Sequence, residues 1–362
     1  MEAQLYPDDF DGIIAGAPGN NLTALAGEFF PWIAQANTDR SGRQILNADK
    51  LQLLNTKVLA ACDTEDGLAD NMLSDPRSCT FDPATIRCPN GTDRTDCLTS
   101  AQVETVRKIY QGPVDDRGRR LFPDSLPRGT ELAWRGYVVA PQGQSMSGLA
   151  ALGLNYLKFF GSWDNPPGTF TLADHRFDMR TFTKLRQMSG IYDATDPDLS
   201  RFRDRDGKLL IWHGWSDPAI PPPAASPTTM PSPNGWADYA PPRSSPACSC
   251  SPASTTAPAA TARTSPTCSP RCTTGSNTAR HRTASPPRRR AVTRSCAPRP
   301  AFPYPLQARY DGIGNPDDAA NFVATAPRRP ADDTFPWLGD FRSGYRQTCL
   351  WEGTRLVCER TP

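Results

Sequence analysis

The residues with the clearest chemical potential lie between positions 62 and 72. This segment, CDTEDGLADNM, holds three aspartates at relative positions 0, 3 and 7 and a glycine that can turn the chain. A hard cation such as Ca²⁺ takes about six to eight oxygen ligands and mixes carboxylates with backbone carbonyls. The segment therefore predicts a calcium loop; the alternative is an acidic surface turn, because the EF-hand spacing is not met. The candidate ligands are the side chains of Asp63, Asp66 and Asp70 and the carbonyls of Leu68 and Met72.

A second candidate is Asp217, in the run HGWSDP at 213–218. It follows the apolar residues 209–212, which are typical of a buried parallel strand with a loop at its carboxyl end. An acid in such a loop can accept a hydrogen bond from a catalytic imidazole and fix its tautomer. The same acid can instead start the turn before Pro218, as aspartate often does. The residues alone leave both interpretations open.

Secondary structure must position these side chains. Residues 2–18 indicate the end of a helix, a Pro-Asp turn, a short buried strand and a Gly-Pro stop. From about 20 to 200 no alternating strand and helix rhythm occurs, and helices are predicted instead at 48–61, 99–110, 146–160 and 178–189. The order strand, long insertion, strand favours an α/β sheet whose two strands are separated by a lid.

The run YPDDFDGIIAGAP at 6–18 closely resembles the segment that follows the nucleophile elbow in the tannase and feruloyl esterase family of α/β-hydrolases. The stretch DDAANF at 317–322, with FPYP before it at 302–305, resembles the C-terminal end of that family. The resemblance covers residues 2–220 and 299–325. It implies that the chain begins about eight residues after the serine that such an elbow supplies.

The resemblance implies an α/β fold: a partial α/β-hydrolase sheet with a large inserted lid domain and a disordered Pro/Ser/Arg-rich tract. Five divisions are expected. They are 1–19, the helix and strand after the nucleophile; 20–200, the lid with the calcium loop; 201–221, a core strand and the loop of the triad acid; 222–298, the low-complexity tract; and 299–362, the C-terminal segment.

In the family a serine, a histidine and an aspartate act together, and Asp217 stands where the triad acid stands. The family's base comes later, beside a cysteine, and maps near Thr256, so His213 is interpreted as a loop-structuring residue. The string nearest to an elbow, GQSMSG at 143–148, is interpreted as a helix N-cap. The family also has a calcium loop, CDxxDGxxDG, where this chain carries Asn71 in place of the last glycine.

Residues 221–300 differ in character from the rest of the chain. They hold seventeen prolines and ten arginines, no lysine or glutamate and one aspartate, so they carry +9 while the whole chain carries +2. Their low aliphatic content cannot offset the cost of ordering a backbone. Three interpretations are a disordered linker, an arginine-rich nucleic-acid arm around 288–290, and an out-of-frame translation. A shift of one nucleotide permits family-like motifs in the required order, including Tyr-His-Cys at 255–257, and favours the third.

Six cysteines outside that tract fall into three close pairs: Cys62/Cys79, Cys88/Cys97 and Cys349/Cys358. Local, even pairing indicates disulfides and an exported protein. The third pair could staple a C-terminal hairpin. A mean hydropathy of −0.54 and the lack of a long apolar run predict no transmembrane helix. No signal peptide is visible, although intact relatives are expected to be secreted or periplasmic.

The resemblance implies a carboxylic ester hydrolase of the tannase and feruloyl esterase type, a serine hydrolase that cleaves aryl esters such as ferulate or gallate esters through an acyl-enzyme. This chain is expected to be inactive, because a triad reduced to its acid has no route to covalent catalysis. The alternative is a non-catalytic, calcium-binding lid fragment. The expected ligands are a small aryl ester in intact relatives and a structural Ca²⁺ in the lid, with no nucleic acid and no membrane.

Overall fold

The computed structural model describes residues 1–196, 198–222, 300–302, 306–326, 347–352 and 355–360. The described residues belong to one unit, made of Met1–Ser249 and Ala297–Pro362. The expected low-complexity tract at 222–298 lies outside the described residues except for residue 222. None of the described helices has the length and apolar character that a membrane span requires.

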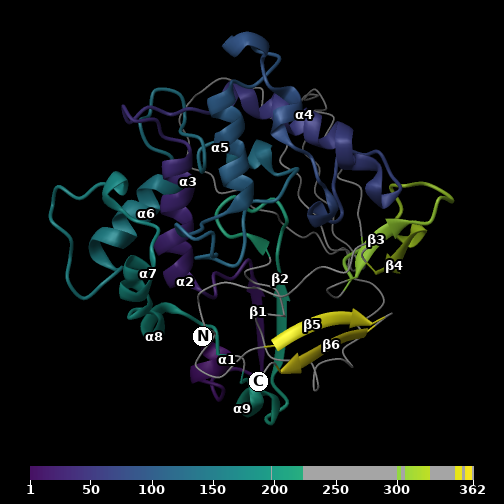
Figure 1. The fold of residues 1–362 in the computed structure, drawn as a ribbon. Helices are drawn as coiled ribbons and strands as arrows, with labels where there is room; N and C mark the ends of the chain where they lie inside the picture. The colour runs from purple at the N-terminus through teal and green to yellow at the C-terminus, as the bar shows by residue number, and fades with distance from the viewer. Residues whose placement is uncertain (197, 223–299, 303–305, 327–346, 353–354, 361–362) are drawn as a thin grey trace, which may run out of the picture. The chain divides into compact units, whose positions relative to one another are not determined.

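The two predicted core strands lie side by side, as Figure 1 shows. Strand β1 (Gly12–Gly16) pairs in parallel with β2 (Lys208–Trp212), and Ile13 lies opposite Leu209. The short helices α1 (Glu2–Leu5) and α9 (Ser200–Arg203) flank these strands in the sequence. Segments nearly two hundred residues apart therefore form one parallel pair, as the sequence pattern predicted.

One face of this strand pair is covered and the other is open. Ala3, Leu199 and Phe202 form a small buried cluster against which Ile13 and Leu209 pack. On the opposite face Ile14 is 72% exposed, Leu210 53% and Trp212 59%. The prediction of buried strands is therefore wrong for this face. Alternation along a strand sends every second side chain to the other side, where the described residues provide no cover.

The main hydrophobic core lies in the helical insertion, a name used here for residues 20–194 between β1 and β2. Helix α3 packs against α5 and α6, and α2 against α7 and α8. Phe29, Ile33, Leu54, Val106 and Trp134 are wholly buried in this core. The helices are α2 (Leu22–Ala24), α3 (Phe30–Ala36), α4 (Leu51–Cys62), α5 (Ser100–Gln111), α6 (Gly148–Phe159), α7 (Met179–Arg186) and α8 (Ser189–Tyr192).

Side-chain caps explain where several of these helices begin. Thr99 and Gln102 form a reciprocal capping box at the start of α5. Ser147 accepts a hydrogen bond from the Ala150 amide and Asp178 caps α7, so GQSMSG does hold an N-cap. Short 3₁₀ turns occur at Ala48–Lys50, Asp63–Asp66, Pro76–Ser78, Pro83–Ile86, Pro89–Gly91, Glu131–Trp134, Leu172–Asp174 and Ala319–Asn321.

The helical run at 22–36 was not predicted, because Gly27 and Pro31 are typical helix breakers. The chain accommodates them with a π-helical turn, η1 (Leu25–Phe29), which places Pro31 in the first turn of α3. Proline is tolerated there because the π turn just before it already interrupts the regular i→i−4 hydrogen-bond ladder. A Cβ at Gly27 would lie 2.9 Å from Leu185 Cδ1, so a larger residue there would require the Leu185 side chain to shift.

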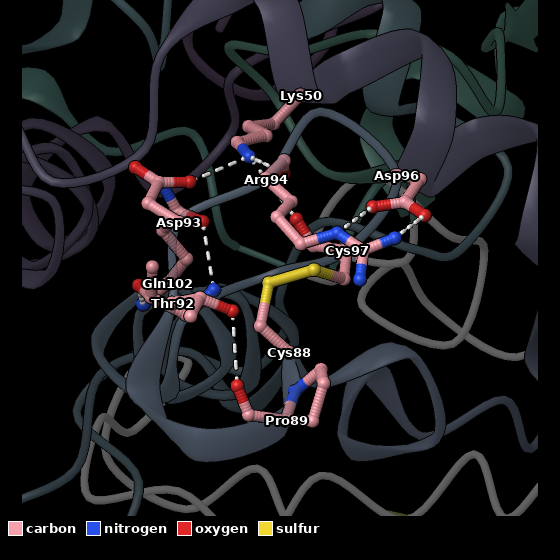
Figure 2. The surroundings of a disulfide bond; sticks show 10 residues. Lys50, Cys88, Pro89, Thr92, Asp93, Arg94, Asp96, Cys97 and Gln102 are labelled. Carbon is pink, nitrogen blue, oxygen red and sulfur yellow. Dashed lines mark hydrogen bonds and ion pairs between the residues drawn. A yellow bond between two sulfur atoms is a disulfide. The ribbon is translucent and has the colours of Figure 1, made fainter.

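Two of the three predicted disulfides are present, Cys62–Cys79 and Cys88–Cys97. Figure 2 shows the second, next to the buried ammonium group of Lys50. Lys50 is 4% exposed and donates hydrogen bonds to the Asp93 carboxylate (2.8 Å), the Cys97 carbonyl (3.1 Å) and the Arg94 carbonyl. A buried lysine needs such partners, so Lys50 fixes the disulfide loop to the start of α4.

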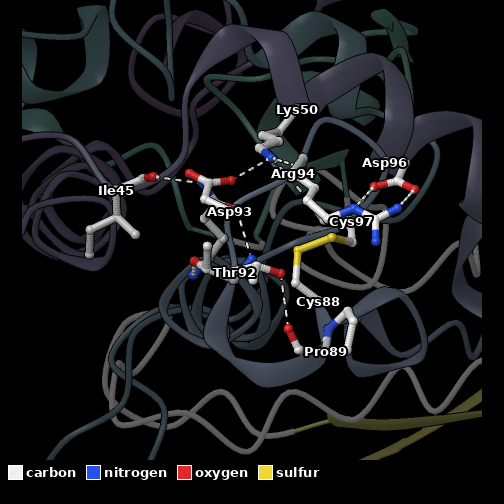
Figure 3. A network of polar contacts seen from close by, with 11 residues as sticks. Ile45, Lys50, Cys88, Pro89, Thr92, Asp93, Arg94, Asp96 and Cys97 are labelled. Atoms are coloured by element: carbon white, nitrogen blue, oxygen red, sulfur yellow. Dashed lines mark hydrogen bonds and ion pairs between the residues drawn. A yellow bond between two sulfur atoms is a disulfide. The ribbon is translucent and has the colours of Figure 1, made fainter.

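Polar contacts beside Lys50 also reach Ile45, which precedes it in the chain, as Figure 3 shows. The Gln102 side-chain amide donates to the Ile45 carbonyl (3.3 Å), and its oxygen accepts from the Thr99 amide (2.9 Å). The capping box of α5 is therefore also a tertiary contact.

The C-terminal part forms two antiparallel hairpins. One pairs β3 (Gln307–Tyr310) with β4 (Phe322–Thr325), and the other pairs β5 (Gln347–Glu352) with β6 (Arg355–Arg360). The predicted hairpin is thus confirmed, and its register places Cys349 directly opposite Cys358. The third predicted disulfide concerns side chains outside the described ones.

Candidate active site

The candidate site lies at the carboxyl edge of the strand pair. Where β1 ends, the Ala17 amide donates to the Trp212 carbonyl (2.8 Å), so the loops that follow both strands start side by side. Ala17 has a φ of +47°, a left-handed conformation that is uncommon for alanine. Gly16 lets the two strand ends lie this close together, because a Cβ at position 16 would lie 2.5 Å from the Trp212 ring. Ligands of α/β sheets bind at this edge.

Asp217 lies in the loop after β2. Its Oδ1 accepts hydrogen bonds from the amides of Ala219 (2.8 Å) and Ile220 (2.9 Å), so the residue does cap the turn at Pro218. Within the described residues its Oδ2 accepts no hydrogen bond. The two interpretations of Asp217 are therefore compatible, since one oxygen holds the loop and the other can orient an imidazole.

The Asp217 loop is anchored to the helical insertion. Ala219 and Ile220 pack against the main core. Before them, the Trp215 ring lies under the Arg77 guanidinium, with Cζ 5.2 Å from the ring centre. The loop therefore has a defined position relative to the helices.

Neither described histidine hydrogen-bonds with Asp217. The Nδ1 of His213 lies 3.1 Å from the Gly214 carbonyl, a contact that suits a loop-structuring residue. Burial lowers the pKa of His213, and the negative charge of Asp217 opposes that shift only in part. His175 is buried against Glu28. The third histidine, His281, and the expected base position at Thr256 lie outside the described residues.

The predicted calcium loop forms a compact turn held by its own backbone. Asp63 accepts hydrogen bonds from the amides of Asn71 and Met72 (3.0 Å each). Asp66, 8% exposed, accepts from the Leu68 amide (3.1 Å) and from a serine hydroxyl. The donor set is all oxygen, as calcium requires. However, in the part of the chain that the structure describes, no three His, Cys, Asp or Glu side chains converge to hold a metal ion.

A polar clasp joins the two ends of the helical insertion. The Ala194 amide donates to the Asn20 carbonyl (2.6 Å), and the Thr23 amide donates to the Asp193 carboxylate (2.8 Å). The Gln4 side chain adds a third link, donating to the Ala194 carbonyl (3.0 Å). Burial raises the pKa of Asp193 to about 6, while hydrogen bonds from Thr23 and the charge of Arg186 oppose the rise. Sequence patterns did not predict this clasp.

A second buried acid lies in the π-helical turn. Glu28 is wholly buried, and its Oε2 lies 3.2 Å from Nε2 of His175, which is 4% exposed. Burial raises the pKa of Glu28, and the hydrogen bond to His175 opposes that rise. The sequence holds only three histidines, but nothing in it shows that one of them meets Glu28.

Comparison with known proteins gives one family. Residues 1–227 match the family model described as "Tannase and feruloyl esterase". An uncharacterized esterase of Xanthomonas campestris pv. campestris is 33% identical over 234 residues, 61% of this chain and 39% of that protein. A probable feruloyl esterase B-2 of Aspergillus flavus is 34% identical over 59% of this chain and 39% of that protein. The mono(2-hydroxyethyl) terephthalate hydrolase of Piscinibacter sakaiensis is 31% identical over 61% of this chain and 44% of that protein.

Solved structures agree with these relatives in fold. An esterase from Aspergillus oryzae superposes with a TM-score of 0.53 at 25% identity, covering 62% of this chain and 42% of that one. Feruloyl esterase B from the same organism gives 0.53 at 23% identity, with the same coverage. The chain thus spans about two fifths of the length of the relatives that it matches.

Proposed function

Because the chain belongs to the tannase and feruloyl esterase family, we propose that it is part of a carboxylic ester hydrolase in which Asp217 is the acid of a Ser-His-Asp triad. The observation that carries this proposal is the parallel pairing of β1 with β2, which brings the Asp217 loop to the ligand-binding edge of the sheet. The helical insertion would act as the lid that shapes the acyl pocket.

Asp217 would act through its Oδ2. The Ala219 and Ile220 amides hold Oδ1 and so fix the carboxylate. Oδ2 would then accept the Nδ1–H of the catalytic imidazole, leaving Nε2 to take the proton of the serine. The imidazolium formed in that step is stabilised by the carboxylate charge. The described residues supply neither that imidazole nor a nucleophile elbow, and we propose that this chain alone does not turn over esters.

The substrates would be esters of aromatic acids. Supporting this, the names of the relatives include feruloyl esterases and a hydrolase of mono(2-hydroxyethyl) terephthalate, both of which cleave aromatic esters. The two disulfides support export from the reducing cytosol.

The decisive experiment begins with the nucleotide sequence, including the stretch before Met1. The prediction is an in-frame serine elbow upstream and a His-Cys pair after a one-base shift in the region of residues 255–257. The restored enzyme should hydrolyse methyl ferulate or methyl gallate, and Asp217→Asn should lower kcat at least about a thousandfold, since the wrong tautomer then prevails. A restored enzyme that keeps its activity in Asp217→Asn would refute the triad assignment.

We also propose a structural calcium ion in the 62–72 loop. On binding, the side chains of Asp63, Asp66 and Asp70, which do not converge in this structure, would gather around the ion with the carbonyls of Leu68 and Met72. The all-oxygen donor set and the Cys62–Cys79 disulfide that closes the loop support it. Calcium would rigidify the loop and take no part in ester chemistry. Calcium should raise the Tm of this chain, and Asp66→Asn should abolish that rise; an unchanged Tm would leave the acidic-turn interpretation. A rise in Tm without turnover is also what a non-catalytic lid fragment predicts.

A further inference from the structure

A cavity of about 310 Å³ opens on the helical insertion, and none of its lining residues belongs to the calcium loop at 62–72. Its lining comes from the end of α5, from the 3₁₀ turn Pro83–Ile86 and its cap, and from Arg128. The lining residues are Asp82, Pro83, Arg107, Tyr110, Gln111 and Arg128. None of them belongs to residues 2–18 or 207–222, so the lining shares no residue with the candidate active site.

Arg128 is held in place before any ligand arrives. Its Nε donates to the Phe81 carbonyl (2.7 Å), and its guanidinium lies over the Tyr110 ring with Cζ 4.6 Å from the ring centre. Tyr110 is itself fixed, because its hydroxyl donates to the buried Glu131 carboxylate (2.6 Å). Within the described residues the two Nη groups of Arg128 make no hydrogen bond. A donor pair that is already ordered loses little entropy on binding.

The charges at the cavity favour a monoanion. Asp82 forms a two-fold ion pair with Arg107 (3.0 and 2.7 Å), and the hydrogen bond from Arg107 lowers the pKa of Asp82, so that carboxylate is ionised. The lining side chains themselves, two guanidinium groups and one carboxylate, carry a net charge of +1; the Glu131 carboxylate lies behind Tyr110 and is not part of the lining. The negative charge of Asp82 would repel a dianion such as sulfate. A single carboxylate neutralises the net charge of the lining, and its two oxygens match the paired N–H donors of a guanidinium.

We propose that this cavity is a binding site for an organic monocarboxylate, held through the Nη groups of Arg128. The body of the ligand lies against Pro83 and the aliphatic stem of Arg107, and Gln111 offers an amide to its polar groups. The volume is at the small end of the range for ligand sites, which suits a single ring. The ring can come from an aromatic acid or from a uronic acid sugar, which share the carboxylate that Arg128 recognises.

Isothermal titration of the full chain with 4-hydroxybenzoate, glucuronate and sulfate at matched ionic strength tests the proposal. At least one carboxylate should bind, and more tightly than sulfate; the one that binds identifies the source of the ring. Arg128→Gln should weaken binding at least about tenfold, since it removes a charged two-point hydrogen bond. Arg135→Gln is the matched control, because Arg135 is an exposed arginine outside the cavity, and it should leave the affinity unchanged.

Asp82→Asn supplies a test of opposite sign and covers the case in which Arg128→Gln does not fold. Asparagine can still cap the 3₁₀ turn, where Asp82 accepts from the Ala84 amide. Removing the carboxylate also releases Arg107 for the ligand, so the affinity for the carboxylate should rise severalfold. The proposal is overturned if sulfate binds as tightly as both carboxylates, if no carboxylate binds, if Arg135→Gln weakens binding as much as Arg128→Gln, or if Asp82→Asn fails to tighten it.

Discussion

Asp193 should make the stability of this protein depend on pH in a direction opposite to that of most carboxylates. Burial raises its pKa from 3.8 to about 6 in the folded state. The folded state therefore binds the proton more tightly than the unfolded chain does. The stabilisation from the protonated acid is fully present below about pH 3.8 and is lost as the pH rises through about 6.

The magnitude follows from the same shift. At about 1.4 kcal/mol for each pKa unit, a rise from 3.8 to about 6 means that the ionised carboxyl costs the folded state up to about 3 kcal/mol. Asp193→Asn removes that charge but keeps an Oδ1 that can accept from the Thr23 amide. The variant should thus be more stable than the parent by up to about 3 kcal/mol at pH 8 and nearly equal to it at pH 4.

Urea unfolding of the parent and the variant between pH 4 and pH 8 provides the measurement. The difference between the two free energies of unfolding isolates Asp193, because every other ionisable group is the same in both proteins. Asp9→Asn is the matched control, since Asp9 is exposed, and it should change the free energy of unfolding little at any pH. A variant that is less stable than the parent at pH 8, or a difference that does not vary with pH, would refute the reasoning.

Three further substitutions test the fold. Lys50→Met removes three hydrogen bonds of a buried ammonium group and should lower the free energy of unfolding by about 2–4 kcal/mol; an unchanged urea midpoint would contradict that. Replacing Cys88 and Cys97 together by alanine opens a short loop and should cost about 2–3 kcal/mol, so equal stability of the oxidised parent and the variant would be the contrary result. Gly16→Ala places a Cβ against the Trp212 ring and should alter the near-UV circular dichroism while lowering the Tm; identical spectra would show that the indole has room to move.

The sequence predicted elements whose signals are local. The capping box of α5 is readable because Thr99 and Gln102 are three residues apart, and the N-cap at Ser147 follows from the same rule. The pairing of β1 with β2 was predictable because each is a short apolar run followed by a glycine-containing loop, and the order strand, long insertion, strand is typical of two strands of one sheet. Local chemistry and the order of motifs were sufficient for these features.

Features that depend on distant neighbours were not predictable. Asp193 meets Thr23 across 170 residues and Glu28 meets His175 across 147, so nothing near either acid in the sequence shows that it is buried. The exposure of Ile14 depends on which elements cover the sheet, and an alternating pattern does not contain that information. The helical turn through Gly27 and Pro31 was missed because local propensity was overridden by packing against Leu185.

The clasp between Asn20 and Ala194 has an evolutionary consequence. The Ala194 amide donates to the Asn20 carbonyl (2.6 Å), so the module leaves and rejoins its host at neighbouring points of the backbone. Such a module can be lengthened, shortened or exchanged for another without changing the spacing of the host strands, as in successful domain grafts. The insertion that shapes the substrate pocket can then change in sequence while the strands that carry the catalytic residues stay the same. Substrate range can therefore diverge faster than the catalytic core.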